Sequence, residues 1–137
     1  MDRMIFVNLP VRDLARSQAF FRSLGFDFNP QFTNEQGACM VIREDAIYAM
    51  LLVEPFFQTF TRKRVADPRG SAQVLICLSC SSREEVDALM AKALQAGATE
   101  PGEPKDHGSM YYRAFDDLDG HGWELMWMDP AATACPA

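Results

Sequence analysis

The sequence predicts an α+β domain in which helices cover one face of a mostly antiparallel sheet. The main observation is that one order of segments occurs twice, about 70 residues apart: a strand, a helix closed by glycine, and about three strands. Val11 of the first half corresponds to Cys80 of the second, and Gly25 corresponds to Gly97. The repeat divides a single domain, 1–137, into two βαβββ modules at about 4–53 and 73–129, joined by a linker over 54–72.

The first module begins with a predicted strand and helix. Residues 4–11 are short, apolar and partly β-branched, which is typical of a strand. Asp13 follows at the position of a helix N-cap, and residues 14–24 place their large apolar side chains on one helical face. Gly25 then ends the helix.

Three more strands complete this module. Residues 26–32 alternate between apolar and polar side chains, as a half-buried strand does. Residues 38–43 and 46–53 are apolar runs joined by a hairpin-length loop. Prolines and a glycine interrupt the linker that follows, in which three phenylalanines suit one amphipathic turn: Phe56, Phe57 and Phe60.

The second module repeats the strand and the helix. Residues 73–80 form the predicted strand, and Ser82 with Glu85 makes a capping box at the start of the helix. Gly97 ends that helix, as Gly25 ends the first. Its apolar residues recur at helical spacing and predict one buried stripe: Val86, Leu89, Met90, Ala93 and Leu94.

The end of the second module is a hairpin. Residues 99–108 contain at most a short edge strand. Residues 109–115 and 122–128 are the last two strands, and the Asp-Leu-Asp-Gly sequence at 117–120 forms the turn between them.

The composition excludes several functions. The net charge of −6 argues against nucleic-acid binding, because phosphate backbones are bound by concentrated basic patches and the basic cluster at 62–64 is short. The apolar runs are too short to span a membrane, and the first residues lack the features of a signal peptide. We therefore expect a cytoplasmic protein without membrane or nucleic-acid partners.

The cysteines are expected to be thiols. Cys77 and Cys80 form a C-x-x-C, but they lie in a predicted strand, where residues three apart point to opposite faces. A redox-active C-x-x-C instead begins a helix, where the dipole lowers the pKa of the thiol. The motif thus favours neither redox chemistry nor zinc binding.

Two motifs resemble the vicinal oxygen chelate superfamily, which includes glyoxalase I, extradiol dioxygenases, and fosfomycin and bleomycin resistance proteins. Residues 9–26, LPVRDLARSQAFFRSLGF, are similar to V-x-D-L-x-x-S-x-x-F-Y-x-x-L-G-F of the family. Residues 117–125, DLDGHGWEL, are similar to D-P-D-G-x-x-W-E-L, with Leu118 in place of the proline. The resemblance implies that the two modules form a curled sheet around a cleft, with the helices on the outer face.

The resemblance also implies a metal ligand at Glu124, the fourth residue after the turn glycine. The other ligand positions of the family fall at Phe6, Met50 and Leu75, and these side chains do not bind hard metal ions. We therefore expect no cofactor, with a divalent metal held by Glu124 as the alternative.

Strand alternation predicts which side chains line the cleft. Glu124 and Met126 face inward, whereas Trp123 and Leu125 pack on a helix. The expected ligand-binding residues are Phe6, Asn8, Tyr48, Met50, Cys77, Tyr111, Arg113 and Met126. Tyr112 is the alternative to Tyr111 for the tyrosine of the strand over 109–115. Three of the residues have a structural alternative: Arg113 pairs with Glu124 or Asp116, Asn8 satisfies a backbone group at a bulge, and Cys77 is a small buried hydrophobic side chain.

Two catalytic candidates follow from the same placement. Glu124 is suited to act as a base or ligand anchor, and His107, in the loop before a strand that borders the cleft, is the better of the two histidines for an acid–base or binding role. His121 follows the turn glycine and is expected at the surface.

Two functions remain open at this point. One is a protein that binds a small, partly apolar molecule without the family's metal centre, like the bleomycin resistance proteins. The other is a glyoxalase-like lyase, isomerase or dioxygenase that uses Glu124 as metal ligand or general base. The resemblance further implies a homodimer.

Overall fold

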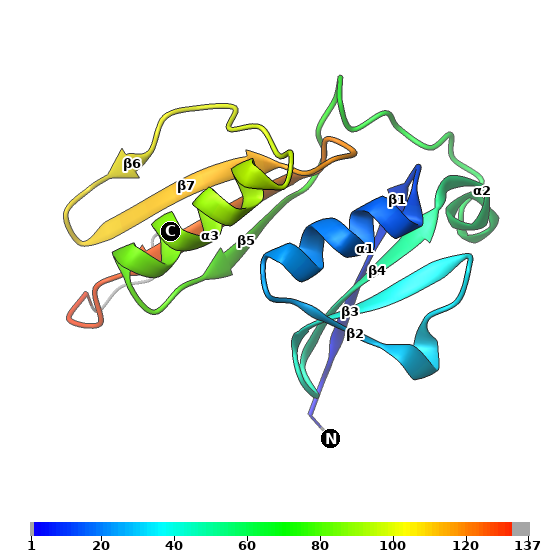
Figure 1. The fold of residues 1–137 in the computed structure, drawn as a ribbon, viewed down its shortest axis with the longest axis horizontal. Coiled ribbons are helices and arrows are strands. Elements are labelled where there is room, and N and C mark those ends of the chain that lie inside the picture. The colour runs from blue at the N-terminus through cyan, green and yellow to red at the C-terminus, as the bar shows by residue number, and fades with distance from the viewer. Residues whose placement is uncertain (1, 133–137) are drawn as a thin grey trace. The chain divides into compact units, whose positions relative to one another are not determined.

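The computed structural model describes residues 2–132, which fall into two compact units. The first unit ends at Asp67 and the second begins at Pro68. Each unit holds one of the two predicted modules, with its own helix and its own sheet (Figure 1).

The first unit follows the predicted order of elements. These are β1 (Ile5–Val11), α1 (Leu14–Ser23), β2 (Asp27–Asn29), β3 (Gly37–Arg43), β4 (Ile47–Val53) and α2 (Glu54–Phe57), with 3-10 turns at Pro30–Phe32 and Gln58–Phe60. Asp13 caps α1 as predicted, because its carboxylate accepts a hydrogen bond of 3.1 Å from the backbone N–H of Arg16. Gly25 follows the helix with a φ of +100°, a conformation that favours glycine.

The second unit repeats this arrangement. Its elements are β5 (Leu75–Ser79), α3 (Arg83–Gln95), β6 (Lys105–Asp106), β7 (Met110–Asp116) and β8 (Gly122–Met128). Ser82 caps α3 by accepting a hydrogen bond of 3.0 Å from the N–H of Glu85. The carboxylate of Glu85 reaches back to the N–H of Ser81 at 3.2 Å, so the capping box is closed one residue earlier than in its usual form.

Each sheet joins its first strand to its last. The strand orders are β1-β4-β3-β2 and β5-β8-β7-β6. The pairs β1–β4 and β5–β8 are parallel, and the other pairs are antiparallel. The predicted fold class is confirmed as two βαβββ modules, and each module forms a four-stranded mixed sheet.

A core lies between the helix and one face of the sheet in each unit. In the second unit α3 contacts β7 and β8. The buried side chains there are Val86, Met90 and Ala93 of α3, Phe115 of β7, and Trp123 and Leu125 of β8. The apolar stripe of α3 is narrower than predicted, because Leu94 is 39% exposed.

The predicted strand over 26–32 is too long. β2 ends at Asn29, because Pro30 has no N–H to give to the sheet and begins a 3-10 turn instead. The side chain of Asn29 stabilises this turn by accepting a hydrogen bond of 3.0 Å from the N–H of Gln31.

The start of the linker is helical, as its phenylalanines suggested. Phe56 and Phe60 meet edge to face, with ring centroids 5.1 Å apart. Neither α2 nor any other helix within residues 2–132 is long and apolar enough to cross a membrane.

Candidate functional site

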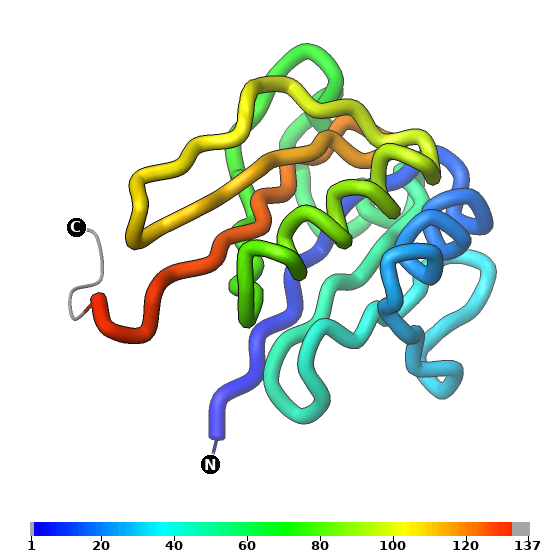
Figure 2. The backbone as a smooth tube through the Cα atoms, turned by 60° about the vertical axis from the view of Figure 1, so that its left-hand side comes forward, coloured from blue at the N-terminus to red at the C-terminus, as the bar shows by residue number. Residues whose placement is uncertain are grey.

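Glu124 lies on the face of the second sheet that is opposite α3, and we call this face the uncovered face. Along β8, Trp123 and Leu125 are each 1% exposed beneath α3, so the alternating residues Glu124 and Met126 lie on the opposite face. Figure 2 shows β7 and β8 running side by side, and β5 pairs with the other edge of β8. The predicted orientation of β8 is therefore confirmed, and Glu124 lies on an interior strand.

Small residues flank Glu124 in the sheet. Glu124 lies opposite Cys77 of β5 and Ala114 of β7. No hydrogen bond or ion pair within the described residues engages its carboxylate. The carboxylate is therefore available to accept a hydrogen bond from a ligand or to pair with a cationic group.

The thiol of Cys77 is a weak nucleophile in this setting. Burial raises the pKa of Cys77, and the nearby Glu124 carboxylate raises it further. Burial and Glu85 together raise the pKa of Cys80 to about 11. A thiol with a raised pKa forms less of the thiolate, which is the reactive species.

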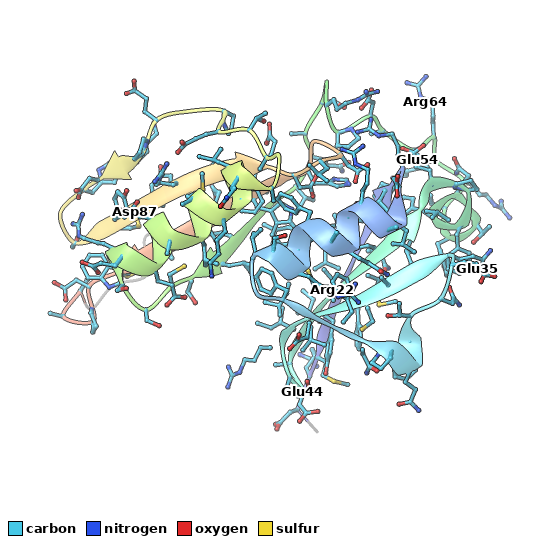
Figure 3. The ribbon with its side chains drawn as sticks, in the orientation of Figure 1. Arg22, Glu35, Glu44, Glu54, Arg64 and Asp87 are labelled. Carbon is cyan, nitrogen blue, oxygen red and sulfur yellow. The ribbon has the colours of Figure 1, made fainter. Side chains whose placement is uncertain are left out.

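Tyr111 and Arg113 were predicted to face the cleft, and this placement is wrong. Both residues lie on the face of β7 that α3 covers, where each bonds to Asp87 of the helix. Figure 3 labels Asp87 on α3. The Tyr111 hydroxyl donates to the Asp87 carboxylate at 2.6 Å, and this bond is the main cause of the lowered pKa of Asp87. The guanidinium of Arg113 donates two bonds to Glu100, at 3.0 and 2.9 Å.

The alternative pairing of Arg113 with Glu124 or Asp116 is wrong as well, because Glu100 and Asp87 are its acidic partners. The error arose because the alternating residues of β7 were assigned to the wrong faces of the sheet. Tyr112, not Tyr111, shares the uncovered face with Glu124, since it lies opposite Met126. We therefore assign the tyrosine of this face to Tyr112.

His107 lies at the edge of the same face. It follows β6 in the turn to β7, and its backbone N–H donates to the carbonyl of Met110 at 2.8 Å. Its imidazole lies against the ring of Tyr112, with the centroids 6.2 Å apart. His107 is exposed, and it does not lie opposite Glu124 in the strand pairing. These two candidates therefore do not act on each other as a neighbouring acid and base.

The first unit presents an aromatic and apolar face of its own. Phe6 and Tyr48 stack with ring centroids 4.9 Å apart and planes at 9°. Asn8 lies opposite Met50 in the regular parallel pairing of β1 with β4. That pairing has no bulge, so a bulge does not explain Asn8. Phe6, Asn8, Tyr48 and Met50 thus share one face of their sheet, as predicted.

Sequence reasoning missed the role of Asp117. Its Oδ1 accepts hydrogen bonds from the N–H groups of Asp119, Gly120 and His121 at 3.0, 3.1 and 3.0 Å. Its Oδ2 accepts a bond of 3.0 Å from the indole Nε1 of Trp123. Asp117 therefore fixes both the turn and the first buried side chain of β8, one residue before Glu124. The Asp-x-Asp-Gly motif was the available signal, but it indicated only a turn.

A cavity of about 600 Å³ lies at the β2 edge of the first unit. It is lined by Gly25, Phe26, Asp27, Phe28, Asn29, Pro30, Val41, Ile42 and Glu44. None of the predicted site residues lines it. Its lining comes from β2, the end of β3 and the residues next to them, at the margin of the sheet, so we base the candidate site on the sheet faces.

The side chains do not fit the metal centre that the family resemblance implies. Glu124 supplies one oxygen donor, but Phe6, Met50 and Leu75 occupy the other implied positions. Within residues 2–132, no group of three or more His, Cys, Asp and Glu side chains is arranged to hold a metal ion.

Comparisons with known proteins agree with this fold. Residues 3–42 match the family described as bleomycin resistance protein-like N-terminal. Hypothetical protein SA1046 from S. aureus is 29% identical and superposes with a TM-score of 0.77, covering 93% of this chain and 95% of that one. No curated protein matches the chain.

Two further solved structures have the same fold at lower identity. A glyoxalase/bleomycin resistance protein/dioxygenase family enzyme from Burkholderia phytofirmans PsJN is 17% identical, with a TM-score of 0.74 over 90% of this chain and 96% of that one. The genomically encoded fosfomycin resistance protein FosX from Listeria monocytogenes is 18% identical, with a TM-score of 0.67 over 95% and 96% of the two chains.

Proposed function

We propose that this chain, which has the fold of the glyoxalase/bleomycin resistance/dioxygenase proteins of the vicinal oxygen chelate superfamily, binds a small, partly apolar molecule on the uncovered face of its second sheet. Glu124 is the polar anchor for that molecule. Binding does not require the metal centre of the superfamily.

The unengaged carboxylate of Glu124 carries this proposal. A partly buried carboxylate on an interior strand loses hydration, and a hydrogen-bond donor or cation from a ligand would compensate for that loss. Met126 lies two residues along β8 on the same face, and Met side chains adapt to apolar groups of different shape. A ligand with a donor group next to an apolar body therefore suits this surface.

The first unit presents a separate apolar surface, on one face of its own sheet. Phe6 is 49% exposed although its ring is stacked on Tyr48, so one face of an aromatic pair is open to a partner. A flat apolar ligand gains both buried area and ring stacking at such a surface.

The names of the structural neighbours include an enzyme and a resistance protein, so the fold is compatible with either function. An enzyme in which Glu124 ligates a metal or acts as a base is the alternative. The side chains at the family's four metal-ligand positions favour binding of a small molecule over metal-dependent catalysis, because one of the four, Glu124, can donate to a metal ion. We also retain a cytoplasmic location and a homodimer as parts of the proposal. Light scattering on the purified protein tests the homodimer.

The proposal is tested with aryl amines and the matching aryl alcohols as ligands. We expect the amines to shift the backbone NMR signals of Cys77, Ala114 and Met126. Glu124→Gln should weaken amine binding about tenfold, because a charge-assisted hydrogen bond becomes a neutral one. The matched control is Glu84→Gln, which removes an exposed carboxylate on α3 and should leave the affinity unchanged.

Two outcomes would contradict the proposal. Binding that is equally tight in Glu124→Gln would remove Glu124 as the anchor. About one equivalent of a divalent metal in the purified wild type, absent from Glu124→Gln, would instead favour the enzyme.

A further inference from the structure

We propose that Lys105, His107 and Tyr112 form an anion-binding subsite at the outer end of the uncovered face of the second sheet. The ligand would then carry a carboxylate or a similar anionic group at the end remote from Glu124. This inference rests on the proposed function, because it describes the other end of the same ligand.

Strand register brings the three side chains together. Lys105 of β6 lies opposite Tyr112 of β7, and Tyr112 lies opposite Met126 of β8. The adjacent pair, Asp106 and Tyr111, lies on the face that α3 covers, so Lys105 and Tyr112 lie on the uncovered face. The imidazole of His107 lies against the Tyr112 ring.

The hydrogen-bond donors of this cluster are available. Neither the ammonium of Lys105 nor the hydroxyl of Tyr112 has a hydrogen-bond or ion-pair partner within the described residues. By contrast, the hydroxyl of Tyr111 is committed to Asp87 at 2.6 Å. An ammonium, a phenol and an imidazole on one surface can donate to a single carboxylate, which has lone pairs for all of them.

The turn that carries His107 is held from the other side of the sheet. The Arg83 guanidinium of α3 donates to both carboxylate oxygens of Asp106, at 2.7 and 3.0 Å, and to the carbonyl of Gly108 at 2.7 Å. Asp106 also accepts from the N–H of Gly108 at 2.9 Å. Arg83 itself lies over the rings of Tyr111 and Trp127, 5.2 and 5.0 Å from their centroids. We call this arrangement the Arg83 clamp.

The Arg83 clamp has two effects on the subsite. It fixes an exposed turn before any ligand arrives, so binding does not have to order that turn. It also compensates the charge of Asp106, the acidic residue between Lys105 and His107, so that this carboxylate does not cancel the positive charge of Lys105.

The spacing of the two ends defines the ligand class. Lys105 lies two strands away from Glu124 and two residues further along the ladder, which separates their Cα atoms by about 12 Å. Met126 and Tyr112 cover the surface between them. The ligand is therefore a dipolar molecule with a donor or cationic end, an apolar middle and an anionic end.

The test uses 3-[4-(aminomethyl)phenyl]propanoic acid and its primary carboxamide, which differ only at the anionic end. We expect the wild type to bind the acid about tenfold more tightly than the amide in calorimetric titrations, because the acid makes charge-assisted hydrogen bonds. Lys105→Met and Tyr112→Phe should each lower this ratio. The matched controls Lys92→Met and Tyr111→Phe remove the same groups from other surfaces and should leave it unchanged.

Arg83→Met tests the clamp with the same two probes. If the clamp positions the subsite, the affinity for the acid should fall while the affinity for the amide stays nearly constant. A general loss of structure would weaken both probes equally and would overturn the positioning role.

The results also separate the two proposals. Equal binding of acid and amide would overturn the anion-binding subsite but leave the anchor at Glu124 intact. Failure of both probes to bind would overturn the subsite and the proposed function together.

Discussion

Asp117→Asn tests whether the carboxylate of Asp117 holds β8 in place. The asparagine carbonyl can still accept from the three N–H groups of the turn, at Asp119, Gly120 and His121. The asparagine NH₂ group, however, would face the indole N–H of Trp123, where Oδ2 now accepts at 3.0 Å. Two donors would then meet at a site where Asp117 is 8% exposed and Trp123 is 1% exposed.

The magnitude follows from that single contact. Losing a hydrogen bond costs about 1 kcal/mol, and leaving a buried donor without a partner costs about 1–3 kcal/mol, so we expect a loss of about 2–4 kcal/mol in the free energy of unfolding. Asp117→Ala removes the acceptors of all four bonds and should cost more. The loss should appear in the unfolding of the second unit, which contains both residues.

The assay is urea unfolding followed by tryptophan fluorescence and circular dichroism. The control is the same substitution in a Trp123→Phe background, which lacks the indole N–H and should reduce the cost of Asp117→Asn to less than about 1 kcal/mol. Equal losses in the two backgrounds would refute the reasoning, because the cost would not come from the bond to Trp123.

Two further predictions concern turns. In thermal unfolding, Gly120→Ala should destabilise the protein by at least about 2 kcal/mol and Gly25→Ala by about 1 kcal/mol. Both glycines have a φ of +100°. A Cβ at residue 120 would lie 2.9 Å from the Arg69 backbone, whereas nothing lies within 4 Å of a Cβ at residue 25. Equal losses would show that backbone conformation alone sets the cost. Hydrogen bonds from Arg83 and from the N–H of Gly108 lower the pKa of Asp106 to about 2, below the ordinary value of about 4. The Arg83 clamp should therefore stabilise the turn at His107 fully above pH 4, and this stabilisation should be lost as the pH falls through about 2. The protection factor of the Gly108 amide, the ratio of its intrinsic exchange rate to its observed rate at the same pH, should fall as the pH is lowered through about 2 in the wild type but not in Arg83→Met. A protection factor that does not change with pH in the wild type would contradict this.

The elements of the fold could be predicted where the signal is local. Asp13 and Ser82 cap the helices that follow them, because capping depends on residues within one turn. Gly25 and Gly97 adopt positive φ at the helix ends for the same reason. The strand over 26–32 was predicted too long, since the alternation of side chains continues past Pro30 although the hydrogen bonding does not.

The site was predictable in β8 and not in β7. Along β8, Trp123 and Leu125 alternate with Glu124, so hydrophobicity alone indicates which face is buried. In β7 two tyrosines are adjacent, and the phase depends on Asp87, which lies on α3 and bonds the first of them. Such a partner, distant in sequence, cannot be identified from the strand itself.

The parallel pairing of first and last strands has a consequence for folding during synthesis. In each unit the first strand finds its hydrogen-bonding partner only after about 40–50 further residues have been made. In the first unit β1 and β3 wait for β4, which lies between them, and in the second unit β5 and β7 wait in the same way for β8. Until β8 emerges, β5 and β7 expose the backbone groups that β8 will bond, so the strand that carries Glu124 also removes two exposed strand edges that favour aggregation of the nascent chain.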